Sequence, residues 1–114
     1  METIEYVCSQ GELEDHLLGW LAQLNQAIFK MDESPDQLAS YLETRSRVLI
    51  CFALVDGEPI GFKAGTDEGG GLFESWRGGI LNSYRRRGIA TELTRLQHAW
   101  CLENGFSRIR TVTN

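Results

Sequence analysis

The stretch that most constrains the fold of this chain is "RVLICFALVDGEPIGFKAGT", residues 47–66. It contains two runs rich in β-branched and aromatic residues, and the runs meet at Asp56-Gly57. Because this dipeptide tolerates the positive φ angles of a tight turn, it is a strong signal for a hairpin. The sequence therefore predicts two antiparallel strands in the middle of the chain.

Helical and extended patterns alternate on both sides of this hairpin. Ser34, Pro35 and Gln37 have the residue types of a helix start with a capping box. The expected elements are a strand at 3–7, helices at 12–29 and 34–44, two strands within 47–66, a strand at 72–81, a helix at 88–104 and a strand at 107–114. The order β-α-α-β-β-β-α-β, without repeat or linker, predicts a single α+β domain over residues 1–114. We expect a three-layer arrangement, a mixed and mostly antiparallel sheet flanked by helices.

The composition is that of a globular protein, with 42% hydrophobic and 24% charged residues and a net charge of −5. No apolar run approaches the roughly 20 residues that span a bilayer, and the N-terminus lacks the order of a signal peptide. Cys8, Cys51 and Cys101 are widely spaced, without a nearby histidine pair. We therefore expect buried, reduced thiols, no metal site, no membrane partner and a cytoplasmic location.

The last predicted strand raises a question about the end of the sequence. A strand that follows a helix in this order is expected to lie parallel to the strand before the helix. Ending the chain at Asn114 leaves that strand with an unpaired edge, which proteins usually cover. The sequence is therefore interpreted as truncated at its C-terminus, and a homodimer formed through this edge is one way to cover it.

The segment "NSYRRRG", residues 82–88, joins the strand at 72–81 to the helix that begins at Gly88. The first N–H groups of a helix have no partner within the helix, and glycine allows an anion to approach them closely. A strand, a basic turn and a helix in this order are therefore typical of an anion site. The alternative is that Arg85 to Arg87 form only a solvated turn.

The run "RRRGIA", residues 85–90, resembles the Arg/Gln-x-x-Gly-x-Gly/Ala signature of the GCN5-related N-acetyltransferases, the GNAT family. The preceding "ILNSY" is similar to the strand end and turn of that family, with Asn82 in place of the usual proline. The order of elements matches too, so the resemblance covers nearly the whole chain. It implies the GNAT acyl-CoA N-acyltransferase fold, with acetyl-CoA as cosubstrate and its pyrophosphate at the turn.

The resemblance assigns cofactor-binding roles to residues around this turn. The backbone N–H groups would hold the pyrophosphate, the arginines would add positive charge, and the Thr91 hydroxyl would contribute a hydrogen bond. The backbone of Ile80 and Leu81 would pair with the pantetheine arm like an added strand, and Asn114 would contact the same arm. The cofactor-binding residues implied in this way are Ile80, Leu81, Arg85, Arg86, Arg87, Gly88, Ile89, Ala90, Thr91 and Asn114.

By the same resemblance, Glu74 matches the catalytic glutamate of the histone-acetylating branch of the family. Glu74 lies six residues before Ile80, so strand alternation predicts that their side chains share one face. Trp76 is expected on that face too, either in the acceptor pocket or in the core. The implied reaction is direct attack of an amine on the thioester, for which a carboxylate can serve as base. The alternative for Glu74 is an exposed strand carboxylate.

The chain also departs from the family pattern. The family normally continues past the position of residue 114 with a helix and two strands, which often carry the tyrosine used as general acid. Tyr84 lies in the pyrophosphate turn and cannot simply take over that role.

Three functions are weighed on this basis. The first is an N-acetyltransferase that moves an acetyl group from acetyl-CoA to a primary amine of a small molecule or peptide, with the acidic balance weakly favouring a cationic acceptor. The second is a non-catalytic acyl-CoA-binding or regulatory module, which the missing C-terminal part favours. The third is nucleic-acid binding through the arginine run. The net charge of −5 and the lack of interleaved aromatic residues oppose it, so no nucleic-acid partner is expected.

Overall fold

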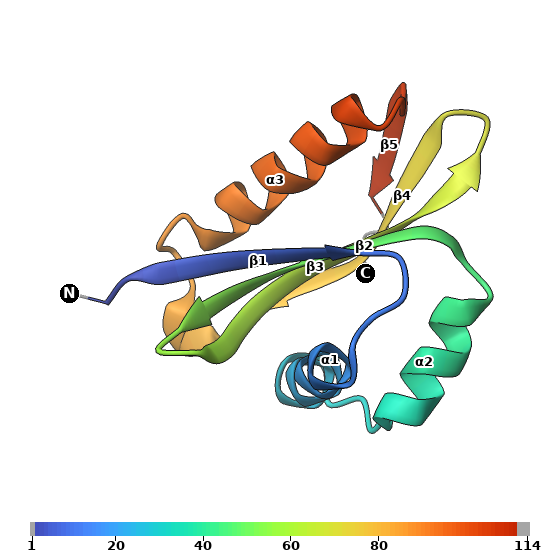
Figure 1. Cartoon of the computed structure of the whole chain (residues 1–114). Coiled ribbons are helices and arrows are strands. Elements are labelled where there is room, and N and C mark those ends of the chain that lie inside the picture. The colour runs from blue at the N-terminus through green and yellow to red at the C-terminus, as the bar shows by residue number, and fades with distance from the viewer. Residues whose placement is uncertain (1, 112–114) are drawn as a thin grey trace.

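The computed structural model describes residues 2–111, which form one sheet with helices on both faces (Figure 1). Within these residues the sheet has five strands in the order β1-β2-β3-β4-β5. Neighbouring strands are antiparallel from β1 to β4, whereas β5 runs parallel to β4. The elements are β1 (Ile4–Gln10), α1 (Asp15–Phe29), α2 (Pro35–Glu43), β2 (Ser46–Val55), β3 (Glu58–Gly69), β4 (Leu72–Ile80), α3 (Ile89–Glu103) and β5 (Arg108–Thr111). In this part of the chain, no helix has the length and apolar character needed to cross a membrane.

The element order predicted from the sequence is confirmed, together with its local turn and capping signals. The turn between β2 and β3 is formed by Asp56 and Gly57, with φ angles of 51° and 78°. At the start of α2 the Gln37 N–H donates to Ser34 Oγ at 3.1 Å, and the Ser34 N–H donates to Gln37 Oε1 at 2.8 Å. Strand β1 is longer than predicted, because residues 4–10 all pair with β2 although several of them are exposed.

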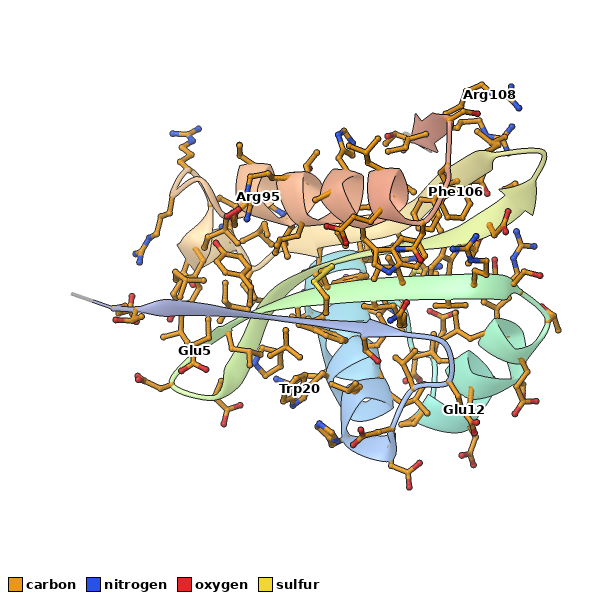
Figure 2. The ribbon with its side chains drawn as sticks, turned by 45° about the horizontal axis from the view of Figure 1, so that its top comes forward. Glu5, Glu12, Trp20, Arg95, Phe106 and Arg108 are labelled. Atoms are coloured by element: carbon orange, nitrogen blue, oxygen red, sulfur yellow. A yellow bond between two sulfur atoms is a disulfide. The ribbon has the colours of Figure 1, made fainter. Side chains whose placement is uncertain are left out.

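Two apolar cores hold the helices on the sheet, one on each face. Leu21 and Phe62 belong to the core under α1 and α2, whereas Phe73 belongs to the core under α3. Figure 2 shows Trp20 of α1 and Phe106, just after α3, on opposite sides of the sheet. The two faces are called the α1 face and the α3 face below.

A β-bulge in β4 changes which face its side chains occupy. Ser75 and Arg77 pair with consecutive residues of β3, so Trp76 lies between them as an extra residue. Strand alternation is interrupted at this point. Phe73 and Ile80 consequently both belong to the α3-face core, although they lie an odd number of positions apart.

The prediction of three buried, reduced thiols is wrong for two of the cysteines. Cys8 of β1 lies directly opposite Cys51 of β2, and a disulfide joins them across the two strands. Cys51 is buried, whereas Cys8 is exposed on the edge strand. The pairing follows from the register between β1 and β2, which the spacing of the cysteines does not reveal. Cys101 is a buried free thiol, and its burial raises its pKa to about 11.

Gly65 provides a test of the packing of β3 on β4. A Cβ at residue 65 would lie 2.7 Å from the Glu74 carbonyl oxygen and would overlap the Phe73 ring. We expect Gly65→Ala to lower the free energy of unfolding by about 1–3 kcal/mol, measured by urea denaturation. Gly19→Ala in α1 is the control, since a Cβ there meets nothing within 4 Å and alanine favours the helix by about 1 kcal/mol. A Gly65→Ala variant as stable as the wild type would contradict this close approach.

Candidate functional site

The turn between β4 and α3 presents a row of backbone N–H groups that have no partner in the described part of the chain. A short 3-10 turn at Asn82–Tyr84 leads into it, and Arg86 and Gly88 have left-handed φ angles of 67° and 76°. The Glu92 N–H makes the first hydrogen bond of α3, to the Gly88 carbonyl. Among the described residues, the N–H groups of residues 86–91 have no hydrogen-bond acceptor. Six such donors at the start of a helix form a site suited to an anion such as a phosphate.

The three arginine side chains of this turn have different surroundings. Arg85 Nε donates a hydrogen bond to the Ile80 carbonyl oxygen at 3.2 Å, which ties the turn to the end of β4. Arg87 forms an ion pair with Glu2 at 2.9 Å. Arg86 is exposed and has no ion pair or hydrogen bond to another residue in the described part of the chain. Arg86 is therefore the arginine whose side chain is free to turn toward an anion at the turn.

The end of β4 has, among residues 2–111, no strand partner on the side away from β3, and this side is called the open edge below. Over the described residues, β5 pairs with β4 only at residues 72–75. The Leu81 N–H donates to β3 at 2.8 Å, and in an antiparallel ladder this directs the N–H and C=O groups of Ile80 and Gly78 to the open edge. An extended ligand can pair with such an edge like an added strand. The Leu81 backbone is not available for this, because its carbonyl also accepts from the Tyr84 N–H at 2.9 Å. The Ile80 carbonyl accepts from Arg85 Nε, so the groups left for a ligand are the Ile80 N–H and the N–H and C=O of Gly78.

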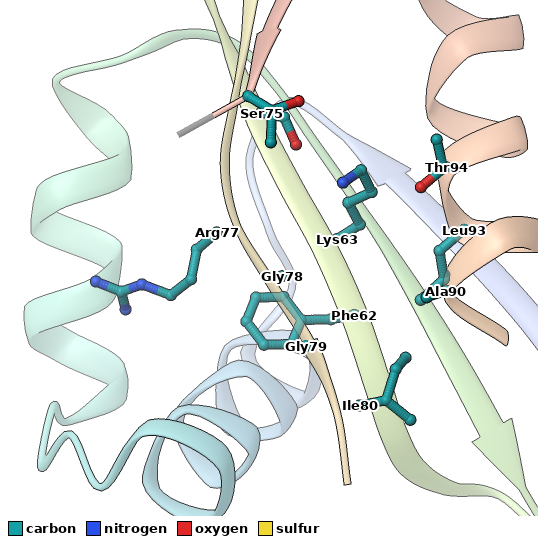
Figure 3. A pocket seen from close by; sticks show the side chains of 11 residues that line it. Phe62, Lys63, Ser75, Arg77, Gly78, Gly79, Ile80, Ala90, Leu93 and Thr94 are labelled. Atoms are coloured by element: carbon teal, nitrogen blue, oxygen red, sulfur yellow. The ribbon is translucent and has the colours of Figure 1, made fainter. Parts of the chain in front are cut away.

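A cleft follows this open edge between β4 and α3 (Figure 3). It consists of a cavity of about 390 Å³ at the turn and a cavity of about 200 Å³ farther along β4. Gly79, Ile80 and Ala90 line both cavities, so the two are adjacent along β4. The cleft therefore suits a long ligand that has an anionic group at one end and an extended arm at the other.

Most of the residues predicted to bind the cofactor meet in this cleft. The cavity at the turn is lined by Ile80, Arg85, Arg86, Gly88, Ile89, Ala90 and Thr91, together with Gly79 and Tyr84. Arg87 is not among its lining residues, and Leu81 packs against both apolar cores. Asn114 lies outside the described residues, so its predicted contact is not placed.

Glu74 and Ile80 lie on opposite faces of the sheet, so the prediction that they share one face is wrong. Phe73 belongs to the α3-face core, and alternation places Glu74 on the α1 face. The bulge at Trp76 then returns Ile80 to the α3 face. Trp76 does share the α1 face with Glu74, as predicted, where it packs against the core and stacks on Tyr41 with ring centroids 5.0 Å apart.

The Glu74 carboxylate is bound by an arginine of β5. Arg110 Nη2 and Nε lie 2.6 and 2.9 Å from Glu74 Oε1, and the Glu74 side chain is only 16% exposed. Arg110 also lies 3.8 Å from Glu68, which pairs with Arg45. Glu74 is thus one member of a row of alternating charges. Before the Glu74 carboxylate can accept a proton from a substrate, it has to give up part of its hydrogen bonding to Arg110.

Lys63 of β3, which belongs to no motif of the sequence, lines the cavity beside β4. Lys63 is half-buried, and desolvation lowers the pKa of its ammonium group below 10.5. The sequence signal was a lone charged residue between Phe62 and Ala64, in an otherwise apolar run. A lone lysine in an apolar run indicates a polar contact on a buried face, but it does not identify the group that the lysine contacts.

Several solved structures share this fold at low sequence identity. The aminoglycoside N-acetyltransferase AAC(6')-Iy in complex with CoA matches with a TM-score of 0.75 and 19% identity, over 98% of this chain and 79% of its own. An aminoglycoside acetyltransferase from an uncultured soil metagenomic sample, in complex with sisomicin, matches with a TM-score of 0.75 and 17% identity, over 96% of this chain and 78% of its own. The PaiA N-acetyltransferase from Thermoplasma acidophilum in complex with coenzyme A matches with a TM-score of 0.74 and 16% identity, over 94% of this chain and 79% of its own. A comparison with curated proteins finds no match.

The sequence also matches a family model, that of the acetyltransferase (GNAT) family, over residues 12–114. This range includes the basic turn, the open edge of β4 and all three helices of the structure. The fold and the family predicted from the sequence are both confirmed by these comparisons. The chain belongs to the GNAT family of acetyltransferases.

Proposed function

We propose that this protein transfers the acetyl group of acetyl-CoA to a primary amine of a small molecule or peptide. The observation that carries the proposal is the row of free N–H donors at residues 86–91, which leads directly into the open edge of β4. The negative charge of the CoA pyrophosphate suits the N–H donors. The amide groups of the pantetheine arm can form hydrogen bonds with the open edge of β4. Two proteins of the same fold, AAC(6')-Iy and PaiA, have structures in complex with CoA.

The proposed cofactor contacts differ in part from those expected from the sequence. The backbone from Arg86 to Ala90 holds the pyrophosphate, with the Arg86 guanidinium and the Thr91 hydroxyl beside it. Along β4, both backbone groups of Gly78 and the N–H of Ile80 hold the arm, since the Ile80 carbonyl accepts from Arg85 and the Leu81 backbone is engaged within the protein. A contact between Asn114 and this arm stays a prediction from the sequence.

The acceptor amine is proposed to reach the thioester from the α1 face, where Glu74 and Trp76 lie. Three carboxylates on this side, Glu33, Glu68 and Glu74, pair with Arg77, Arg45 and Arg110 in turn. These three carboxylates are each paired with a guanidinium group and are not offered as partners for a cationic acceptor, so the proposal names only a primary amine. A cytoplasmic location and a homodimer remain predictions from the sequence.

Gly88→Glu tests the pyrophosphate site. Gly88 has a φ angle of 76°, and the added carboxylate would compete for the same N–H groups and repel a phosphate. We expect the Kd for CoA to rise by about 100-fold, measured by titration calorimetry. Gly105→Glu is the matched control: its φ angle is 83°, it follows the other end of α3, and a Cβ at either glycine meets nothing within 4 Å.

The outcomes of this comparison separate the alternatives. Both variants place a side chain in the left-handed region, so both should lose stability, but only Gly88→Glu should lose CoA affinity. Equal CoA affinity in the two variants would contradict the pyrophosphate assignment. Tight CoA binding by the wild type, with no thiol release from acetyl-CoA over a panel of primary amines, would favour the non-catalytic CoA-binding module instead.

Glu74→Gln tests whether this carboxylate removes the proton from the attacking amine. We expect kcat to fall by about 100-fold with an unchanged KM for acetyl-CoA. Glu68→Gln is the control, because Glu68 belongs to the same row of charges. Equal losses of kcat in the two variants would mean that the charge row, and not a base at Glu74, sustains the rate.

A further inference from the structure

Lys63 lies inside the cleft, and its side chain has no partner among residues 2–111. It faces α3, because its neighbours Phe62 and Ala64 belong to the core of the α1 face. The cavity that it lines also contains Thr94 of α3 and Ser75 of β4, and Figure 3 shows the Lys63 amino group extending between these two side chains. In the described part of the chain, Lys63 forms no ion pair and no hydrogen bond through its side chain.

The position opposite Lys63 on β4 is a glycine, and this leaves the lysine next to the open edge. Lys63 and Gly78 are direct cross-strand partners, and a Cβ on Gly78 would lie 3.4 Å from both the Cα and Cγ atoms of Lys63. The Lys63 stem thus lies over a strand position that has no side chain. Gly78 directs its own N–H and C=O to the open edge, so the ammonium group lies beside the part of the edge where an extended ligand would bind.

The distance along β4 fits the far end of a ligand anchored at the turn. The cavity at the turn and the cavity that contains Lys63 share Gly79, Ile80 and Ala90. Gly78 lies two residues, or about 7 Å, beyond Ile80 along the strand. A molecule whose phosphates bind at the turn and whose arm follows β4 therefore brings its distal end toward Lys63.

We propose that Lys63 is the proton donor to the sulfur of the departing CoA thiolate. This inference rests on the proposed function. In the step, the acceptor nitrogen forms a bond to the carbonyl carbon, the C–S bond breaks, and its electron pair goes to the sulfur. Lys63 Nζ gives one proton to that sulfur and becomes a neutral amine, while the proton lost by the acceptor nitrogen goes to the base. Lys63 then regains a proton from water, so the products are the amide and the CoA thiol.

The surroundings of Lys63 suit this role. Desolvation lowers the pKa of its ammonium group, which makes it a better proton donor than an exposed lysine. No carboxylate lines this cavity within the described residues, and the Arg77 guanidinium is turned to Glu33 at 2.9 Å. Cys51, the partner of Lys63 on β2, is held in the disulfide and does not titrate.

The tyrosines near the cleft are placed less well for this role. The Tyr84 hydroxyl donates to Glu2 at 3.2 Å, and desolvation together with that carboxylate raises the Tyr84 pKa. Tyr84 lines the cavity at the turn, where the pyrophosphate is proposed to bind. Tyr41 stacks on Trp76 on the α1 face. Lys63 is the titratable donor that lines the part of the cleft distant from the turn.

The first test measures the thiol of bound CoA, without turnover. The ultraviolet absorbance of the thiolate gives the pH at which the thiol of CoA ionises in the complex. We expect this pH to lie about one unit below that of free CoA in the wild type, because the Lys63 ammonium stabilises the thiolate. Lys63→Met should abolish the shift, and Lys63→Arg, which keeps the charge, should retain it. Lys30→Met is the control, since Lys30 is the other lysine of the chain and is exposed at the end of α1.

The second test measures turnover with the same variants. Lys63→Met should lower kcat by about 100-fold with the Kd for desulfo-CoA unchanged, and Lys63→Arg should be equally slow because its guanidinium does not release a proton. A wild-type rate in Lys63→Met, or a thiol ionisation that does not differ between Lys63→Met and the wild type, would overturn the role of Lys63. In either case CoA binding and turnover by the wild type would still support the proposed function. Failure of the wild type to bind CoA would overturn both.

Discussion

The cleft depends on the two different neighbours of β4. On one side β4 pairs with β3 along nearly its whole length, and on the other it pairs with β5 only at residues 72–75 in the described structure. Continued pairing with β5 would consume the edge groups of Gly78 and Ile80. Helix α3 starts at one end of this open edge and returns the chain to β5 at the other end, so it forms the opposite wall of the cleft. The binding space is therefore a consequence of the sheet topology.

The bulge at Trp76 divides the chemical groups of β4 between the two faces. With uninterrupted alternation Glu74 would share the face of Ile80 and of Lys63 on β3. With one extra residue, Glu74 lies on the α1 face and bonds to Arg110, while Lys63 lies on the α3 face without a counter-ion among the described residues. The sheet thus keeps a carboxylate and an ammonium group on opposite sides of the same strand edge. An ion pair between them would have hindered both from exchanging protons with a substrate.

The fold could be predicted from the sequence because its main signals are complete within a few residues. Asp56-Gly57 forms its turn and Gly88 adopts the positive φ that opens α3 after the basic run, whatever lies elsewhere in the chain. The disulfide and the face of Glu74 depend instead on the register between separate strands, which no short segment encodes. Trp76 has the same residue type whether it is a bulge or a regular strand position. The bulge, and with it the faces of the site residues, therefore became visible only in three dimensions.

Glycines on the α3 face of β3 and β4 explain why a lysine can occupy that face. Ile80 fills the space that a Cβ on Gly61 would take, and Phe73 fills the space above Gly65. The space at Gly78 lies at the open edge, and the nearest atoms to a Cβ there come from β3. Of these three glycines, Gly78 is the one that lines the cavity beside β4, and it is the one opposite Lys63. Lys63 is half-buried and has no side-chain partner among the described residues, so its ammonium group is available to hydrogen-bond to a polar group of a ligand at the open edge beside Gly78.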